Sequence, residues 1–414
     1  MLTILFVAFL LITVVLRLWL ASRQIRHVAA NRGTVPAEFA SRIGLISHQR
    51  AADYTVARVR LSMLEGIFDA AVLIGLTLLG GLQAIDTQVS ALTQHALWHQ
   101  VLLVVVVGLF LGLLGLPFSI YHQFGLESKF GFHRMTPGLF VKDMLTGLLV
   151  GAILGVPLVV AVLWLMASSG TYWWLWAWGL WVAYMLLIML IAPVWIMPLF
   201  NKFTPLADPA LADNIHALAR RCGFSLSGLF VMDGSKRSAH GNAFFTGFGK
   251  SRRIVFFDTL MSRLTPDEII AVLAHELGHF AHKHIIKRLA MSFTGALIFF
   301  ALLGWLARQT WFYTDLGVMP QLGMRNDGMA LILFFLVVPV FTFVLTPVFS
   351  WFSRKDEFQA DHYASTQSAS DQLVSALVKL VDDNASTLTP DPVHSAFYDS
   401  HPPVAIRIRK LLAS

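Results

Sequence analysis

Seven long apolar runs constrain the fold of this chain more than any other feature of its sequence. Each is close to the ~20 residues that an α-helix needs to cross a bilayer. Their approximate bounds are 2–20, 62–85, 99–120, 144–167, 172–197, 290–307 and 329–350. Only 13% of the residues are charged, whereas a soluble domain carries about 25%. The sequence therefore predicts a mainly α-helical membrane protein with seven transmembrane helices.

The basic residues predict how these helices are oriented. If the N-terminus lies outside, 28 of the 31 Lys and Arg residues fall in four inner segments, and the outer loops hold only Arg308 and Arg325. Cytoplasmic loops of membrane proteins are enriched in Lys and Arg. We therefore expect the cytoplasmic side to hold the segments 21–61, 121–143, 198–289 and 351–414.

Composition disfavours a nucleic-acid partner and excludes structures built from several cysteines. The basic residues form no run interleaved with aromatic residues, so no nucleic-acid partner is expected despite the net charge of +7. The single Cys222 excludes an internal disulfide bond and a zinc cluster built from cysteines.

The segment 198–289 is the most soluble in character. A helical pattern begins at Asp208-Pro209, and short β-like runs follow at 228–232, 242–246 and 253–257, which predicts a small antiparallel sheet. Thr265-Pro266-Asp267-Glu268 then has the form of a helix start, with Thr as N-cap, Pro at the first helical position and Glu completing a capping box.

The helix expected after this start carries His275-Glu276-Leu277-Gly278-His279, an H-E-x-x-H motif. Residues four apart share one face of a helix, so His275 and His279 can bind one metal ion together. Glu276 would then act as general base for the water molecule that the metal activates. His282 and His284 lie just beyond and are expected at the surface or in an interface.

A catalytic zinc site needs a third protein ligand. Glu357 and Asp361 are again four residues apart in SRKDEFQADHY. Glu357 is the best candidate for the third ligand, and Asp361 can accept a hydrogen bond from a ligand histidine. The alternative is an exposed acidic helix face. The hairpin of the last two spans returns this segment to the side of His275, which favours the metal site.

Six segments in a fixed order resemble the type I CAAX prenyl endopeptidases, which are integral membrane zinc metallopeptidases. They are LPFSIYHQFGLESKFGFHRMTPGLFVKD, IMPLFNKFTPL, SKRSAHGNAFFTGFGKSRRIVFFDTL, HELGH, SRKDEFQAD and SHPPVAIRIRKL. The resemblance implies seven membrane helices that enclose a hollow chamber, with a zincin-like α+β domain at its cytoplasmic end. It also implies one Zn²⁺ per chain and a peptide or protein C-terminus, possibly lipidated, as substrate.

The resemblance also implies roles for single residues. The zinc ligands would be His275, His279 and Glu357, and the base would be Glu276. Asn242 would lie on an edge strand that holds the substrate backbone. His401 would steady the oxyanion, and Arg407 would sit near the substrate. The chain lacks the long lumenal insertion of eukaryotic members, which suggests a bacterial member in the inner membrane.

The predicted organisation has four parts. Residues 1–197 form five membrane helices with their inner loops, and 198–289 form the metallopeptidase domain. Residues 290–350 form the last two membrane helices, and 351–414 complete the catalytic domain with the third ligand.

Two alternatives remain at this point. One is a quality-control metallopeptidase that resembles the heat-shock membrane peptidases, although those have fewer spans. The other is a transporter or channel with an accessory zinc site. The apolar runs contain few charged residues, which disfavours a transport path. Glu65 and Asp69 in the second run are the exceptions, and we interpret them as lining the chamber.

Overall fold

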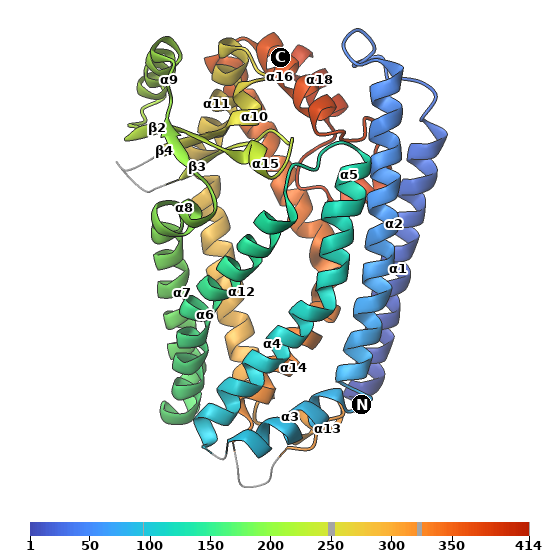
Figure 1. The fold of residues 1–414 in the computed structure, drawn as a ribbon, viewed down its shortest axis with the longest axis vertical. Coiled ribbons are helices and arrows are strands. Elements are labelled where there is room, and N and C mark those ends of the chain that lie inside the picture. The colour runs from blue at the N-terminus through green and yellow to red at the C-terminus, as the bar shows by residue number, and fades with distance from the viewer. Residues whose placement is uncertain (94, 247–252, 321–324, 414) are drawn as a thin grey trace.

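Long helices run along most of the molecule and meet a smaller α+β domain at one end (Figure 1). The computed structural model describes residues 1–93, 95–246, 253–320 and 325–413. The long helices are α1 (Leu2–Ala30), α2 (Leu45–Leu76), α4 (Ala96–Ile120), α6 (Pro137–Ser168), α7 (Trp173–Ile191), α12 (His284–Leu306), α14 (Asp327–Thr342) and α15 (Thr346–Gln367). Shorter helices α3 (Gly81–Leu92) and α13 (Thr310–Thr314) lie at the end opposite the small domain, near the N-terminus.

Six helical segments of the described chain are long and apolar enough to cross a membrane. A seventh is formed by α2 and α3 together, which meet at an angle of 58°. The predicted run 62–85 therefore contains a break between Leu76 and Gly81, where the chain bends. The last run is also not an isolated span, because α14 continues through the short helix Phe343–Leu345 into α15. The chain thus spans the membrane with six or seven helical segments, as the apolar runs predicted.

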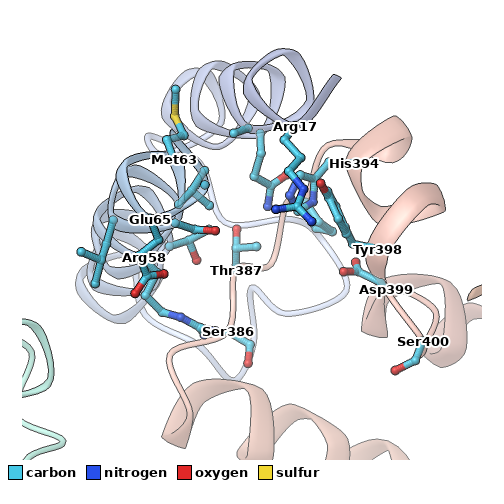
Figure 2. Close-up of a pocket in the computed structure, with 18 of the residues that line it drawn as sticks. Arg17, Arg58, Met63, Glu65, Ser386, Thr387, His394, Tyr398, Asp399 and Ser400 are labelled. Atoms are coloured by element: carbon cyan, nitrogen blue, oxygen red, sulfur yellow. The ribbon is translucent and has the colours of Figure 1, made fainter. Parts of the chain in front are cut away.

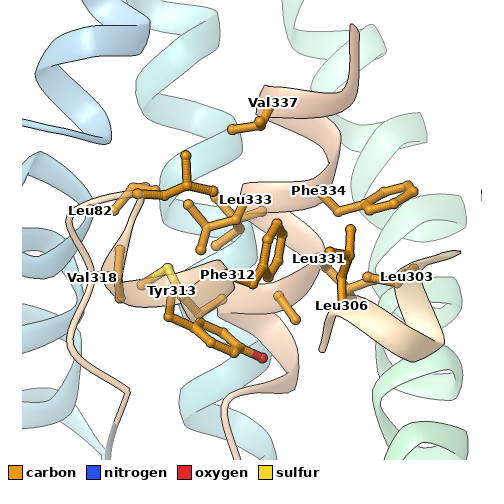
Figure 3. Packing of buried hydrophobic residues seen from close by; sticks show 14 of the residues in the cluster. Leu82, Leu303, Leu306, Phe312, Tyr313, Val318, Leu331, Leu333, Phe334 and Val337 are labelled. Carbon is orange, nitrogen blue, oxygen red and sulfur yellow. The ribbon is translucent and has the colours of Figure 1, made fainter. Parts of the chain in front are cut away.

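An apolar core ties the membrane helices together at the end opposite the small domain (Figure 3). Leu82 of α3, Phe312 of α13 and Leu333 of α14 are at most 2% exposed and belong to one cluster. Away from this core the helices bury little. In every span except the last, less than a quarter of the most apolar stretch is buried. Most of the apolar surface of these helices is therefore left for contact with lipid rather than with other helices.

The small domain contains a four-stranded sheet in the order β1-β2-β4-β3. Its strands are β1 (Phe203–Pro205), β2 (Gly228–Met232), β3 (Ala243–Thr246) and β4 (Arg253–Phe257). The expectation of a purely antiparallel sheet is corrected here, because β2 and β4 pair in parallel. The reason is that β3 lies on the outer edge of β4 rather than between β2 and β4. The Gly-rich, basic turn expected at 247–252 lies outside the described residues.

Helices pack around this sheet and complete the domain. They are α9 (Pro209–Arg221), α11 (Pro266–Ala281), α16 (Ser370–Asp383), α17 (Pro392–Tyr398) and α18 (Val404–Ala413). The buried apolar faces of α9, α11, α16 and α18 form a second core with β2 and β4. The C-terminal helices α16 and α18 thus share this core with elements that precede α12 in the sequence, and α12 begins at His284.

The predicted helix start is present at the N-terminus of α11. The Thr265 hydroxyl accepts from the Glu268 N–H, and the Glu268 carboxylate accepts from the Thr265 N–H at 2.8 Å. Glu268 is 3% exposed. It also accepts from Ser375 Oγ at 2.7 Å and pairs with Lys379 at 2.8 Å. The same carboxylate therefore caps α11 and fixes α16 against it.

The charge of Glu268 is expected to stabilise the fold. Burial raises the pKa of Glu268, but Lys379, Ser375 and the Thr265 N–H together hold it below its ordinary value. Glu268→Gln should cost about 1–2 kcal/mol at pH 7, measured as a lower midpoint of thermal unfolding in detergent. An acidic group whose pKa is lower in the folded than in the unfolded state stabilises the fold at pH values above its unfolded-state pKa. This stabilisation is lost as the pH falls toward the folded-state pKa. The difference in thermal unfolding midpoint between the variant and the unchanged protein should therefore shrink below about pH 4.

Asp267→Asn is the matched control, because Asp267 is in the same helical turn but is exposed. Its substitution should change stability by less than about 0.5 kcal/mol. A Glu268→Gln variant as stable as this control would contradict the assignment.

Candidate metal centre

Three side chains converge where α11 crosses α15. His275 Nε2 and His279 Nε2 are 3.3 Å apart. Glu357 reaches both, with Oε2 3.4 Å from His275 Nε2 and Oε1 3.3 Å from His279 Nε2. The structure thus brings together the three residues that the sequence predicted as metal ligands, and their atoms lie close enough to hold one ion.

The spacing and the chemistry of this trio fit a metal ion. Ligands about 2.0–2.2 Å from a tetrahedral ion lie about 3.3–3.6 Å from one another. The Oε2 atom of Glu357 is buried and has no hydrogen-bond partner in the described part of the chain. A buried carboxylate oxygen without a partner is costly, and a cation bound between the three residues removes that cost.

The two helices that carry these ligands approach each other unusually closely. A Cβ atom on Gly278 would lie 2.9 Å from the Cα atom of Ala360 and 3.1 Å from its carbonyl oxygen. Such distances are shorter than side chains tolerate, so only glycine fits at this position of the motif. Because Gly278 stands between the two histidines and Ala360 is close to Glu357, this contact sets the distance between the ligands.

Behind His275 lies a buried charge pair. His275 Nδ1 is 2.9 Å from the Asp361 carboxylate, as predicted for a residue that orients a ligand. Arg407 donates two hydrogen bonds to the same carboxylate, at 2.8 and 2.6 Å. If Nε2 binds the metal, Nδ1 carries the proton and donates to Asp361. Arg407 is 3.4 Å from His275 Nδ1 but cannot donate to a nitrogen that already carries a proton. Its role is therefore to hold Asp361 in place.

His279 is oriented by a chain of side chains that the sequence did not reveal. Its Nδ1 lies 3.0 Å from His284 Nδ1, and His284 Nε2 lies 2.9 Å from Gln359 Oε1. If His279 Nε2 binds the metal, His279 Nδ1 carries the proton and donates to His284 Nδ1. His284 Nε2 then carries a proton and donates to Gln359 Oε1. Lys283, with φ at 57°, turns the chain between α11 and α12.

That turn buries His284 to 1% exposure. His282 and His284 are expected from the sequence at the surface or in an interface, and His282 is exposed whereas His284 is buried where α12 meets α15. In the sequence, the close spacing of the histidines is the signal that one of them supports the metal centre. It does not show whether that residue is His282 or His284.

The two remaining catalytic candidates border the same trio. Glu276 is half-buried, and its carboxylate has no hydrogen bond or ion pair among the described residues, so its lone pairs are free to accept a proton. His401 Nε2 lies 3.4 Å from Glu357 Oε1, and Ser400 Oγ lies 3.0 Å from His401 Nδ1. A Ser400 hydroxyl that donates to Nδ1 leaves a proton on Nε2, which faces the metal ligands.

Charge at the centre favours a cation. Burial lowers the pKa of His275, but hydrogen bonds that its ring donates to the Asp361 and Glu357 carboxylates raise it to about 9. At His401 burial dominates and lowers the pKa, although the Glu357 carboxylate acts in the opposite direction. His275 thus lies in a negative environment, and His401 favours its neutral form, in which it remains a hydrogen-bond donor.

Asn242 immediately precedes the edge strand β3. Its backbone C=O accepts from the Phe257 N–H at 2.9 Å, and its side chain is exposed. The preceding turn is anchored by His240, whose ring lies 3.4 Å from the Glu127 carboxylate and 3.1 Å from Asn384 Oδ1. One edge of β3 pairs with β4, and the described sheet has no strand on the other edge.

A cavity of about 880 Å³ opens between the α1–α2 pair and the C-terminal segment (Figure 2). His401, Glu65 and Asp69 line it. The two acids of the second apolar run therefore face the interior, as interpreted from the sequence. Because His401 also borders Glu357, the cavity lies next to the metal centre.

Comparisons with known proteins agree with this geometry. The CAAX prenyl protease N-terminal family, with five membrane helices, matches residues 24–202, and peptidase family M48 matches residues 205–414. CAAX prenyl protease 1 of Saccharomyces cerevisiae is 40% identical over 322 residues, which cover 73% of this chain and 71% of the relative. The CAAX prenyl protease 1 homolog of Caenorhabditis elegans is 30% identical over 441 residues, which cover 99% and 98% of the two chains.

The crystal structure of S. mikatae Ste24p is similar over its whole length. It superposes with a TM-score of 0.93 at 31% identity and covers 99% of this chain and 98% of its own. The paired histidines, the convergent Glu357 and the membrane helices thus occur together in a chain that two M48-related families span almost completely. The chain therefore belongs to peptidase family M48, as a membrane metallopeptidase with the five-helix N-terminal region of the CAAX prenyl proteases.

Proposed function

We propose that this protein is a zinc endopeptidase with one Zn²⁺ per chain, held by His275, His279 and Glu357. The observation that carries the proposal is the convergence of these three side chains, with ligand atoms 3.3–3.4 Å apart. Two imidazoles and one carboxylate are a ligand set of catalytic zinc sites, which keep a fourth position open. A zinc ion bound there supplies a Lewis acid that activates water.

The residues around this centre have complementary roles. Glu276 accepts a proton from the attacking water and later delivers it to the leaving amine. His401 donates its Nε2–H to the oxygen that becomes negative at the scissile carbonyl. Asp361 holds the ring of His275, and the His284–Gln359 chain holds that of His279. Asn242 and the free edge of β3 bind the substrate backbone as an added strand.

Arg407 contributes mainly through Asp361. It is 6% exposed, and its bidentate bond to Asp361 uses two of its N–H donors. These contacts support a role in positioning His275, and only a substrate that reaches the buried guanidinium would contact Arg407 directly.

The substrate class follows from the relatives and the cavity. The relatives are named CAAX prenyl proteases, and we propose that this chain cleaves near the C-terminus of membrane-associated proteins, with or without an attached lipid. The interior cavity offers space for the end of a peptide. The same cavity explains why Glu65 and Asp69 are present in the second apolar run, since both line it. No transport path is needed to explain them, which favours the peptidase over a transporter or channel. We further propose a bacterial inner membrane as its location, with the metal centre on the cytoplasmic side.

The role of Glu276 is tested by a substitution that keeps size but removes basicity. Glu276→Gln should retain zinc near the level of the unchanged protein, because Glu276 is not a ligand. Hydrolysis of a farnesylated CAAX peptide should fall by at least ~10²–10⁴-fold, while binding of the peptide survives. Zinc content and single-turnover hydrolysis are measured on the same preparation. Loss of zinc would make Glu276 a ligand, and full activity would move the catalytic centre elsewhere.

The residues behind the ligands give a second test. Asp361→Ala and His284→Ala should each weaken zinc affinity or activity by about 10–100-fold, because each frees a ligand ring to rotate. His282→Ala is the matched control, since His282 is in the same turn but exposed. Zinc affinity is measured by competition with a chromogenic chelator. A His284 variant that behaves like the His282 control would contradict the proposed chain.

The orientation in the membrane is tested with reporters. A fusion after residue 40 and an insertion near residue 240 should give cytoplasmic signals, and an insertion near residue 318 should give an outside signal. The expectation follows from 28 of 31 basic residues in the inner segments. An outside signal near residue 240 would place the metal centre on the opposite face and refute the proposed location.

A further inference from the structure

The cavity beside the metal centre contains a cation whose charge is not compensated. Arg17 lies on α1 near the end of the apolar run 2–20, and its exposed side chain lines the cavity. Its guanidinium lies 4.7 Å from the centre of the Phe343 ring. Among the described residues it forms no ion pair or hydrogen bond. An unpaired charge within a membrane span is costly, and such residues commonly serve a function.

The wall next to Arg17 does not supply a counter-charge. Figure 2 shows that Arg17 points toward Tyr398 and His394, which also line the cavity. Asp399 is the acid on this wall. Burial raises its pKa, which favours its neutral form, although Ser395 and nearby cations act in the opposite direction. Glu65 and Asp69 belong to α2 and do not pair with Arg17. Arg17 therefore has no acid paired with it among the described residues of the cavity wall, although Asp399, Glu65 and Asp69 line the same cavity.

A second arginine of the cavity is in a different situation. Arg58 stacks on the Tyr54 ring at 5.5 Å, and Tyr54 in turn donates to the buried Glu127 carboxylate. Arg58 is therefore connected through Tyr54 to a buried carboxylate, whereas no such connection to an acid is present for Arg17 among the described residues. This contrast selects Arg17 as the residue that is free to bind a ligand.

The dimensions of the cavity match a short peptide. A volume of 880 Å³ corresponds to a space about 12 Å across if it is roughly spherical, and three extended residues span at most ~10–11 Å. His401 lies on the wall of the cavity and borders the metal ligand Glu357. A peptide whose scissile bond is at the metal centre can therefore extend its last residues into the cavity.

We propose that Arg17 binds the terminal carboxylate of the substrate peptide and so measures the distance from the cleaved bond to the end of the chain. This inference rests on the proposed peptidase function and names a specificity determinant for it. The guanidinium donates two parallel hydrogen bonds to a carboxylate. In a cavity that is partly shielded from bulk water such a pair is stronger than on an open surface. Arg17 thereby favours a free C-terminus over an internal segment.

The test compares two peptides that differ only at their ends. One CAAX peptide has a free C-terminal carboxylate, and the other has a C-terminal amide. The unchanged protein should cleave the free acid with a kcat/KM about tenfold or more higher, mainly through KM. Arg17→Gln should lose this preference by cleaving the free acid less efficiently, while cleavage of the amide changes little. Arg17→Lys should retain part of the preference, because it keeps the charge.

Arg26→Gln is the control, since Arg26 lies on the same helix, is exposed and does not line the cavity. It should retain the full preference for the free acid. Zinc content and cleavage of the amide show that each variant is folded. If Arg17→Gln fails to fold, Arg17→Lys is compared with Arg17→Met on the same two peptides.

The proposal is overturned if the unchanged protein cleaves both peptides equally well. It is also overturned if a folded Arg17 variant without the charge keeps the preference or loses activity equally toward both. Failure of the peptidase function itself gives a different result. In that case the unchanged protein would cleave neither peptide faster than the Glu276→Gln variant does.

Discussion

The close packing of α11 on α15 is the contact on which the metal centre depends. Two ligands belong to one helix and the third to another, and the chain between them crosses the membrane twice. Their distance is set by Gly278, which lets the backbone of Ala360 approach to a separation that no other side chain permits. Because α15 continues from the last membrane span, the geometry of the metal ligands is coupled to the arrangement of the membrane helices.

Charge is concentrated where the chemistry needs it. The chain has only six glutamates, and two of them, Glu276 and Glu357, stand at the metal centre. Glu357 and Asp361 are buried, and Arg407 offsets their charge through a bidentate bond to Asp361 and a 3.8 Å approach to Glu357. Removing one partner of such a buried set leaves an uncompensated charge. We infer that the C-terminal helix α18, which carries Arg407, is required for an intact metal centre as well as for the core of the small domain.

Much of this architecture could be predicted because it is encoded locally. The apolar runs, the capping box at Thr265 and the four-residue spacings His275/His279 and Glu357/Asp361 depend on helix geometry alone, and each is present. The pairing of β2 with β4 could not be predicted from short apolar runs, since they do not say which strand lies at the edge. The role of His284 depends on the turn at Lys283, and the cavity depends on how α1 and α2 lean against the C-terminal segment. Both are consequences of tertiary packing.

The central claim is that His275, His279 and Glu357 together hold one zinc ion. Anomalous X-ray diffraction from crystals of the purified protein, collected on both sides of the zinc absorption edge, tests it most directly. The account predicts one peak per chain, about 2.0–2.2 Å from both histidine Nε2 atoms and from an oxygen of Glu357. A peak at another group of residues, such as His282 and His284, or a zinc ion without Glu357 among its ligands, would contradict it.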